Sequence, residues 1–243
     1  MVDYLILMIL HLVGDFYLQT TKIAQCKNAR KGATCGECNK CKDSSWINWK
    51  YLIVHSLLYT TPFAFWYFIM SGISVFIVIF VLFVTHMLID MICCYFNKKR
   101  KQTIVFIIDQ VLHVGILFLL PKFATFDCYI AECYYVVLKV VFTGLMLMMP
   151  CSVIIKKMFE DIYPSSDELR MYDVGEIIGI LERILTFILA CFASFPTIAI
   201  IITVKTWART NDLKDAEFRN KYLLGTLTSL ILALMIFTVY KTI

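Results

Sequence analysis

Long apolar segments, separated by short polar links, recur along the whole chain. Several approach the roughly 20 apolar residues that a helix needs to cross a bilayer core of about 30 Å. Helix breakers fall in or near the links, as at Pro62, Gly72, Pro121 and Pro196. The pattern predicts about eight helices, with seven as the fallback if the short seventh segment only pairs tightly with the sixth. The expected ranges are 3–20, 49–69, 72–95, 103–120, 130–155, 175–193, 196–210 and 220–241.

Composition places these segments in a membrane. Apolar residues make up 60% of the 243 residues and charged residues 17%, with a mean hydropathy of +0.76. Soluble domains average about 45–50% apolar and about 25% charged residues. The N-terminal segment lacks a basic region and a small-residue cleavage site, so we interpret it as a retained first span. The sequence predicts an all-α, polytopic transmembrane helix bundle that forms a single membrane domain over residues 1–243.

Lysine and arginine are concentrated in alternate links. The links after the first, third, fifth and seventh predicted helices are basic, whereas the opposite links hold little beyond Lys122. Basic loops stay in the cytoplasm, so both termini are expected to face outward and a loop at 21–48 to be cytoplasmic. The net charge of +5 follows from this asymmetry, and no nucleic-acid-binding surface is expected.

All four histidines lie inside or at the edge of apolar segments, and three of them stand four residues from an aspartate. Residues four apart share one face of a helix. A charged group in hydrocarbon costs about 2.5–3.5 kcal/mol even on a lenient scale, so it usually marks a functional site. The predicted topology brings these residues to one layer in the cytoplasmic half of the bilayer. We define them as the His/Asp cluster: His11, Asp15, His55, His86, Asp90, Asp109 and His113.

Imidazole and carboxylate are the usual ligands of zinc, iron and manganese. The His/Asp cluster could hold one or two ions, with an aspartate bridging, or some aspartates could orient a histidine through its other ring nitrogen. A bound metal produces hydroxide at neutral pH, and two metals clamp both oxygens of a displaced phosphoryl group. We expect Zn²⁺ or another divalent transition metal, with Asp15, Asp90 and Asp109 as catalytic carboxylates. A proton or ion relay uses the same residue types.

A second polar set lies in the C-terminal half. Glu182 and Arg183 interrupt an apolar helix, and Lys205 and Arg209 stand four apart on the next one. Arginine binds phosphate through a bidentate fork, so the three cations predict a phosphate-binding site. Alternatively, Glu182 neutralises Arg183 or Lys205, and Lys205 and Arg209 anchor the helix at the membrane surface.

The predicted cytoplasmic loop contains a cysteine-rich stretch, CKNARKGATCGECNKC. Overlapping C-x2-C steps are typical of a four-thiolate zinc site, and the reducing cytoplasm disfavours disulfides. A structural Zn²⁺ is expected, because four thiolates leave no open coordination position. An iron–sulfur cluster and free thiols are the alternatives. The four residues are Cys26, Cys35, Cys38 and Cys41.

Six motifs, in chain order, resemble those of one family. They are HLVGDFYLQ, HMLID, DQVLH, GEIIGILERILTFIL, KTWAR and YLLGTLTS. They are similar to motifs of the bacterial membrane proteins grouped as domain-of-unknown-function family 3307, over essentially the whole chain. The cysteine-rich loop departs from that family, in which this link is short and basic. More distantly, histidine and aspartate on membrane helices resemble the inner-membrane metal-dependent hydrolases. The resemblance implies a multi-pass protein of the bacterial inner membrane.

These patterns favour a metal-dependent hydrolase embedded in the lipid bilayer. Its substrate would be a phosphate-bearing lipid or a small anionic molecule that enters from the cytoplasmic leaflet and binds near Arg183, Lys205 and Arg209, with Gln19 and Gln110 orienting it or the water. A metal-ion or proton transporter or channel is the first alternative. Transporters are often built from inverted repeats, and no repeat relates the two halves. A membrane anchor or sensor that recruits a partner through the cysteine-rich loop is the second.

Overall fold

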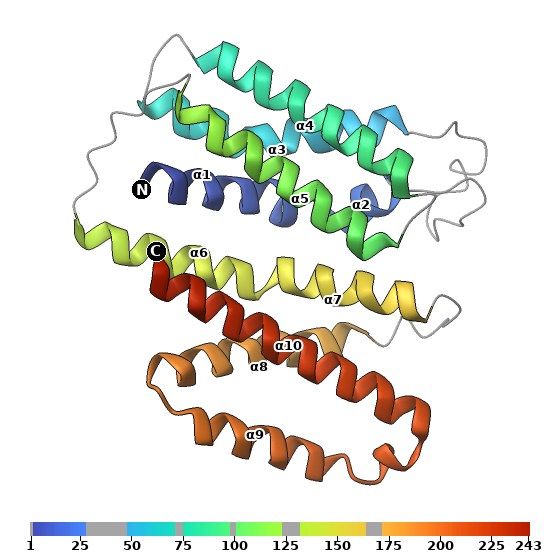
Figure 1. The fold of residues 1–243 in the computed structure, drawn as a ribbon. Coiled ribbons are helices and arrows are strands. Elements are labelled where there is room, and N and C mark those ends of the chain that lie inside the picture. Colours follow the sequence, from blue (N-terminus) through green and yellow to red (C-terminus); the bar gives the residue numbers. More distant parts are fainter. Residues whose placement is uncertain (1, 28–47, 71–74, 98–100, 123–131, 164–171) are drawn as a thin grey trace. The chain divides into compact units, whose positions relative to one another are not determined.

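The computed structural model describes residues 2–27, 48–70, 75–97, 101–122, 132–163 and 172–243 (Figure 1). All regular secondary structure in these residues is helical, which confirms the predicted all-α fold. Each predicted helix has a counterpart, and a short additional helix follows the first. Contacts divide the chain into two compact units, residues 1–138 and 139–243, and each is described by itself.

The first unit is a bundle of four long helical segments with one short helix beside them. The helix α1 contacts α3, α3 contacts α4, α4 contacts α5, and α5 returns to α1, while α2 packs on α3. The centre of the bundle is filled by buried Leu7, Phe63, Tyr67, Leu82 and Leu117. The elements are α1 (Val2–Leu12), the π-helical turn η1 (Val13–Tyr17), α2 (Thr21–Lys27), α3 (Trp49–Met70), α4 (Val75–Asn97), α5 (Gln102–Leu119) and the short η4 (Leu120–Lys122).

The first helix differs from the prediction of one α-helix over residues 3–20. It is α-helical to Leu12 and continues as a π-helical turn over Val13–Tyr17. A methyl group in place of the Gly14 hydrogen would lie 2.6 Å from the backbone oxygen of Tyr59. Glycine therefore permits η1 to approach the backbone of α3 closely.

The second unit packs α10 against α8 and α7, with α9 beside α8. The single predicted helix over 130–155 is broken at Met148, because Pro150 at the start of α7 has no N–H to continue the helical hydrogen bonds. Buried Leu147, Cys151 and Ala233 form the core next to this break. The elements are α6 (Glu132–Leu147), which spans the division between the units, α7 (Met149–Ile162), α8 (Tyr172–Cys191), α9 (Phe195–Ala208), η6 (Asp212–Lys214) and α10 (Ala216–Thr242).

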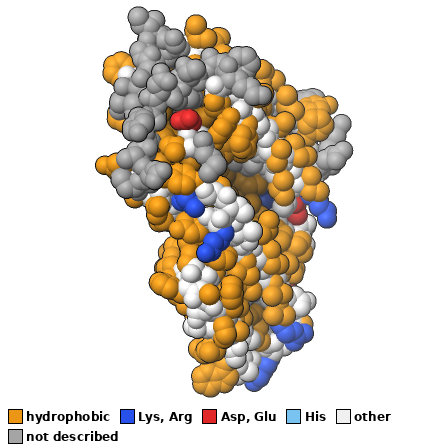
Figure 2. Space-filling model, turned by 60° about the vertical axis from the view of Figure 1, so that its left-hand side comes forward, with side chains coloured by type: hydrophobic (Ala, Val, Ile, Leu, Met, Phe, Trp, Pro, Cys, Tyr) orange, Lys and Arg blue, Asp and Glu red, His pale blue; other side chains and the backbone are white. Residues whose placement is uncertain are grey.

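The surface has the character of a membrane protein. Among the described residues, four helical stretches are long and apolar enough to cross a bilayer, and α9 is a shorter apolar helix. Large apolar side chains such as Phe68 and Phe76 are about four-fifths exposed, at 81% and 79%. Among the residues coloured in Figure 2, apolar side chains are widespread and charged side chains are few. The four stretches are Phe76–Phe96, Gln102–Leu119, Tyr134–Ile162 and Ala216–Thr242.

Candidate metal centre

The first unit brings the whole His/Asp cluster into the interior of its four-helix bundle. His11 comes from the end of α1, Asp15 from η1, His55 from α3, His86 and Asp90 from α4, and Asp109 and His113 from α5. Six of the seven residues are buried, and only the Asp109 side chain is partly exposed, at 14%. The imidazole rings lie close together, since the centroids of His86 and His113 are 4.3 Å apart and those of His55 and His86 are 5.0 Å apart.

One ring nitrogen lies at the centre of this arrangement. His55 Nε2 lies 3.2 Å from Asp15 Oδ1 and 3.5 Å from Asp90 Oδ2. It also lies 3.1 Å from His86 Nε2. A ring nitrogen makes one good hydrogen bond, so hydrogen bonding alone does not account for three such neighbours. Ligand atoms bound at about 2.0–2.1 Å to a tetrahedral ion are about 3.3 Å apart, and the observed spacing fits atoms that share an ion.

The potential ligands form two overlapping groups. Asp15, His55 and His86 each offer one ligand atom, and these atoms lie within 4.8 Å of one another. The same holds for His86, Asp90 and His113. Because His86 belongs to both groups, the geometry accommodates one ion with alternative ligands or two neighbouring ions.

His113 has the orientation expected of a metal-binding histidine. Its Nδ1 donates to the backbone oxygen of Asp109 at 2.9 Å. This leaves the lone pair on Nε2, which is buried and has no hydrogen-bond partner among the described residues. Metal-binding histidines usually donate their other N–H to a carbonyl or carboxylate. His113 Nε2 could therefore serve as a ligand atom for a cation.

The predicted i,i+4 spacing is confirmed on two helices. His86 Nε2 lies 3.6 Å from Asp90 Oδ2, and His113 Nδ1 lies 3.7 Å from Asp109 Oδ2. On the first helix the π-helical turn begins between His11 and Asp15. The i,i+4 rule, which holds for an α-helix, therefore describes this pair less well. Asp15 contacts His55 of α3, and His11 contacts Gln110 of α5.

Gln110 links the first helix to α5. Its Nε2 donates to Asp15 Oδ2 at 2.7 Å and to Asp109 Oδ2 at 3.2 Å, and its Oε1 lies 3.2 Å from His11 Nε2. Gln19, in contrast, binds backbone atoms. With its amide oriented to satisfy both bonds, it donates to the Asp15 carbonyl oxygen and accepts from the Ala24 N–H. Of the two predicted glutamines, Gln110 thus contacts side chains of the His/Asp cluster.

Tyr59 is a member of this site that the sequence analysis missed. Its ring stacks on His86, with centroids 3.7 Å apart and planes 9° apart, and its hydroxyl lies 3.3 Å from His11 Nδ1. The side chain is buried, at 2% exposure. Its position four residues after His55 on one helix is the signal that could have identified it.

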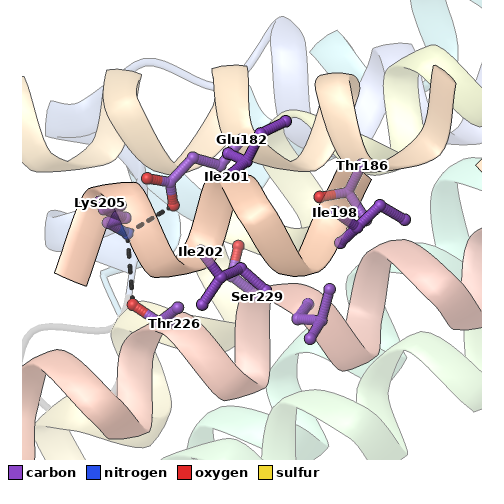
Figure 3. A pocket seen from close by; sticks show the side chains of 9 residues that line it. Glu182, Thr186, Ile198, Ile201, Ile202, Lys205, Thr226 and Ser229 are labelled. Atoms are coloured by element: carbon purple, nitrogen blue, oxygen red, sulfur yellow. Dashed lines mark hydrogen bonds and ion pairs between the residues drawn. The ribbon is translucent and has the colours of Figure 1, made fainter. Parts of the chain in front are cut away.

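In the second unit, Lys205 and Glu182 form an ion pair at a small pocket between α8, α9 and α10 (Figure 3). Lys205 Nζ donates to Glu182 Oε2 at 2.7 Å and to Thr226 Oγ1 at 3.2 Å. Lys205 Nζ and the Arg209 guanidinium lie 5.1 and 5.8 Å from the centre of the Tyr222 ring. The structure therefore brings Lys205 to Glu182, and both cations to one aromatic ring.

Arg183 is directed elsewhere. It is 2% exposed, and its Nε and Nη2 atoms donate to the backbone oxygens of Leu147 and Met148 at 2.7 and 3.3 Å. Further bonds reach Ser152 at 2.7 Å and Ser229 at 3.4 Å. Arg183 thus places positive charge at the carboxyl end of α6, where helix carbonyls need donors. Its guanidinium fork, predicted to bind phosphate, is occupied by protein atoms in this arrangement.

Comparison with known families identifies the chain. It matches the protein family of unknown function DUF3307 over residues 4–36 and 36–142, more than half of the chain. The protein belongs to this family. No curated protein and no solved structure matches the chain.

The DUF3307 match contains every residue of the His/Asp cluster, together with Gln110 and Tyr59. The predicted second-half motifs, with Glu182, Lys205 and Arg209, lie beyond the matched residues, so their resemblance to the family stays a prediction. The two matched stretches meet at Gly36, inside the cysteine-rich loop. Residues 28–47 and the side chain of Cys26 lie outside the described part of the structure, so the predicted zinc site at Cys26, Cys35, Cys38 and Cys41 also stays a prediction.

Proposed function

We propose that this membrane protein is a metal-dependent hydrolase whose centre is the His/Asp cluster. The observation that supports the proposal best is the convergence of two carboxylates and a second imidazole on His55 Nε2, at 3.1–3.5 Å. Carboxylates buried in a membrane bundle are costly unless a cation or hydrogen bonds compensate them. A divalent ion at this point neutralises charge and accounts for the spacing of the ligand atoms.

The donor set favours Zn²⁺ or another divalent transition metal, because imidazole and carboxylate together suit such ions. His55, His86 and His113, with Asp15 and Asp90, are the proposed ligands. The ion would supply a Lewis acid and a source of hydroxide near neutral pH. One ion or two would serve this chemistry.

Asp109 has a different proposed role, as the carboxylate that contacts the water or the substrate. Its side chain is 14% exposed, against 8% for Asp15 and 3% for Asp90. It therefore lies on the accessible side of the cluster. In this position it can accept a proton from a water molecule during hydrolysis, while its backbone oxygen fixes the ring of His113.

The proposed substrate is a phosphate-bearing lipid or a small anionic molecule at the cytoplasmic leaflet of the bacterial inner membrane. The alternation of basic links supports this orientation, and the exposed apolar side chains give a lipid access to the helices. Lys205 and Arg209 belong to the second unit, and their binding of an anion stays a prediction from the sequence. The ion pair with Glu182 reduces the net charge at Lys205, so Arg209 is expected to contribute more to anion binding.

The test is metal content together with hydrolysis. The wild-type protein, purified in mild detergent and equilibrated with Zn²⁺, is expected to retain one or two ions by elemental analysis and to hydrolyse phosphate-bearing lipids. His86→Ala, which removes the residue common to both ligand groups, should lose both properties. Ser56→Ala is the control, because Ser56 is likewise buried, next to His55 on α3, but its hydroxyl binds the Leu52 carbonyl oxygen. A wild-type protein without stoichiometric metal refutes the metal centre.

A metal-ion or proton transporter is the second candidate, and one observation favours it. The four imidazole rings form a contiguous row in the order His11, His113, His86 and His55. The distances between successive ring centroids are 5.9, 4.3 and 5.0 Å. Chains of such groups carry protons or ions in membrane transporters. Proteoliposomes loaded with a Zn²⁺-sensitive or pH-sensitive dye separate the cases: flux without hydrolysis favours transport, and hydrolysis without flux favours the enzyme.

A further inference from the structure

The hydrogen bonds of Gln110 determine which of its amide atoms is the donor. Its Nε2 faces Asp15 Oδ2 at 2.7 Å and Asp109 Oδ2 at 3.2 Å. Carboxylate oxygens accept hydrogen bonds, so the atom between them must be the NH₂ group, and both of its hydrogens are engaged. The other amide atom, Oε1, is therefore an acceptor, and it faces His11.

The acceptor on Gln110 fixes the tautomer of His11. Because Oε1 only accepts, His11 Nε2 must carry the hydrogen that is donated across 3.2 Å. In a neutral imidazole, Nδ1 then has the lone pair. The Tyr59 hydroxyl lies 3.3 Å from this Nδ1 and donates to it. Hydrogen bonds thus run in one direction, from Tyr59 through His11 and Gln110 to the carboxylates.

These hydrogen bonds distinguish His11 from the other three histidines. Both of its ring nitrogens are engaged in hydrogen bonds, and it belongs to neither of the ligand groups found among the described residues. His113 keeps a buried Nε2 without a hydrogen-bond partner in the described structure, and His55 and His86 face each other and the carboxylates. The sequence alone does not distinguish the four imidazoles, whereas the geometry sets His11 apart from the other three.

We propose that Tyr59, His11 and Gln110 form a positioning chain for the carboxylates and that His11 is not a metal ligand. Gln110 holds Oδ2 of Asp15, which leaves Oδ1 directed at His55 Nε2 at 3.2 Å. The chain therefore selects the oxygen that Asp15 presents to the ion. The effect on metal binding rests on the proposed metal centre, while the tautomer of His11 does not.

The first experiment measures the tautomers in metal-free protein. Only four histidines are present, so ¹⁵N-histidine labelling gives a simple spectrum, and His→Gln variants assign each residue. His11 is expected as the Nε2–H tautomer and His113 as the Nδ1–H tautomer. Tyr59→Phe keeps the ring that stacks on His86 but removes the hydroxyl, so it should shift the His11 Nδ1 resonance. An Nδ1–H tautomer at His11 in the wild-type protein overturns the proposed direction of the chain.

The second experiment measures metal affinity and the spectrum of bound Co²⁺. Variants His11→Gln, Tyr59→Phe and Gln110→Met should each retain stoichiometric metal but bind it about 10–100-fold more weakly, as expected when groups that orient the ligands are lost. Each should also shift the Co²⁺ absorption bands. The double variant of Tyr59 and Gln110 should lose less affinity than the product of the single losses, because the residues act as one unit. Tyr67→Phe, a buried tyrosine on the same helix outside the chain, is the control.

The outcomes distinguish this inference from the proposed function. Loss of stoichiometric metal in His11→Gln, as complete as in His86→Ala, shows that His11 is a ligand and overturns the proposal. Affinities within twofold of wild type in all three single variants overturn the positioning role. If the wild-type protein holds no metal, the proposed function fails, and the tautomer measurement still decides whether the hydrogen-bonded chain exists.

Discussion

Among the glycines that the structure describes, Gly14 is the one where an added methyl group would meet the closest neighbouring atoms. A Cβ atom there would lie 2.6 Å from the Tyr59 carbonyl oxygen and 3.1 Å from Tyr59 Cα. Both are backbone atoms, so no side-chain rotation relieves the contact. To bring this Cβ atom and the Tyr59 oxygen to an ordinary contact distance of 3.4 Å, η1 and α3 would have to move apart by about 0.8 Å. Gly14→Ala should therefore displace Asp15 and Tyr59 relative to each other.

Two opposing effects set the size of the change. Alanine favours a helix over glycine by about 0.5–1 kcal/mol. Overpacking of a well-packed interior costs about 1–3 kcal/mol. The steric effect is the larger, because the obstacle is the backbone of a neighbouring helix. We expect Gly14→Ala to destabilise the protein by about 1–2 kcal/mol and to weaken metal binding.

The matched control is Gly115→Ala. Gly115 lies within α5 of the same unit, and a Cβ atom built there meets nothing within 4 Å. This variant should be neutral or slightly stabilising through helix propensity alone. Unfolding followed by tryptophan fluorescence in detergent, with Zn²⁺ titrations of both variants, compares them directly. Equal stability and equal metal affinity for the two variants would refute the close approach of η1 to α3.

Three further predictions concern individual polar contacts. Asp109→Asn should retain metal but slow hydrolysis at least tenfold, as loss of a general base does; elemental analysis and lipid hydrolysis measure the two effects. Arg183→Met should lower the unfolding temperature, because the Leu147 and Met148 carbonyl oxygens lose a buried donor at about 1–3 kcal/mol; Arg183→Lys should recover only part of this loss. Lys205→Met should destabilise the protein more than the double variant with Glu182→Leu, since the single change leaves a carboxylate unpaired; thermal unfolding of both checks this order.

The positions of the helices and the gathering of the His/Asp cluster were predictable from local rules. Spans of apolar residues locate the helices, and alternate basic links orient them, so His55 on α3 and Asp90 on α4 were expected in one layer. They lie 3.5 Å apart. Spacing along a single helix was also sufficient for His86 and Asp90. These features follow from the lengths and order of the apolar segments, the placement of basic links and the spacing within one helix, all of which the sequence contains directly.

Features that depend on contacts between helices were not predictable in this way. The π-helical turn contains Gly14, which lies close to the Tyr59 backbone of another helix, and no local pattern specifies this approach. Pro150 could have marked the break between α6 and α7, but the role of Arg183 at that break depends on α8 lying beside it. An arginine next to a glutamate in an apolar helix gives the same pattern whether it binds phosphate or a carbonyl oxygen.

At a buried polar site, residue type alone does not decide which histidine can bind a metal ion. A metal ligand needs a free lone pair aimed at the ion, and in a bundle without bulk water each buried donor needs an acceptor from the protein. His113 satisfies its donor on a backbone oxygen and keeps Nε2 for a cation. His11 uses both nitrogens in hydrogen bonds to Tyr59 and Gln110. Both residues stand four positions from an aspartate, yet only His113 keeps a lone pair for an ion. In the proposed metal centre the hydrogen-bond directions therefore determine the ligand set, and the tautomers of His11 and His113 are the most direct measure of those directions.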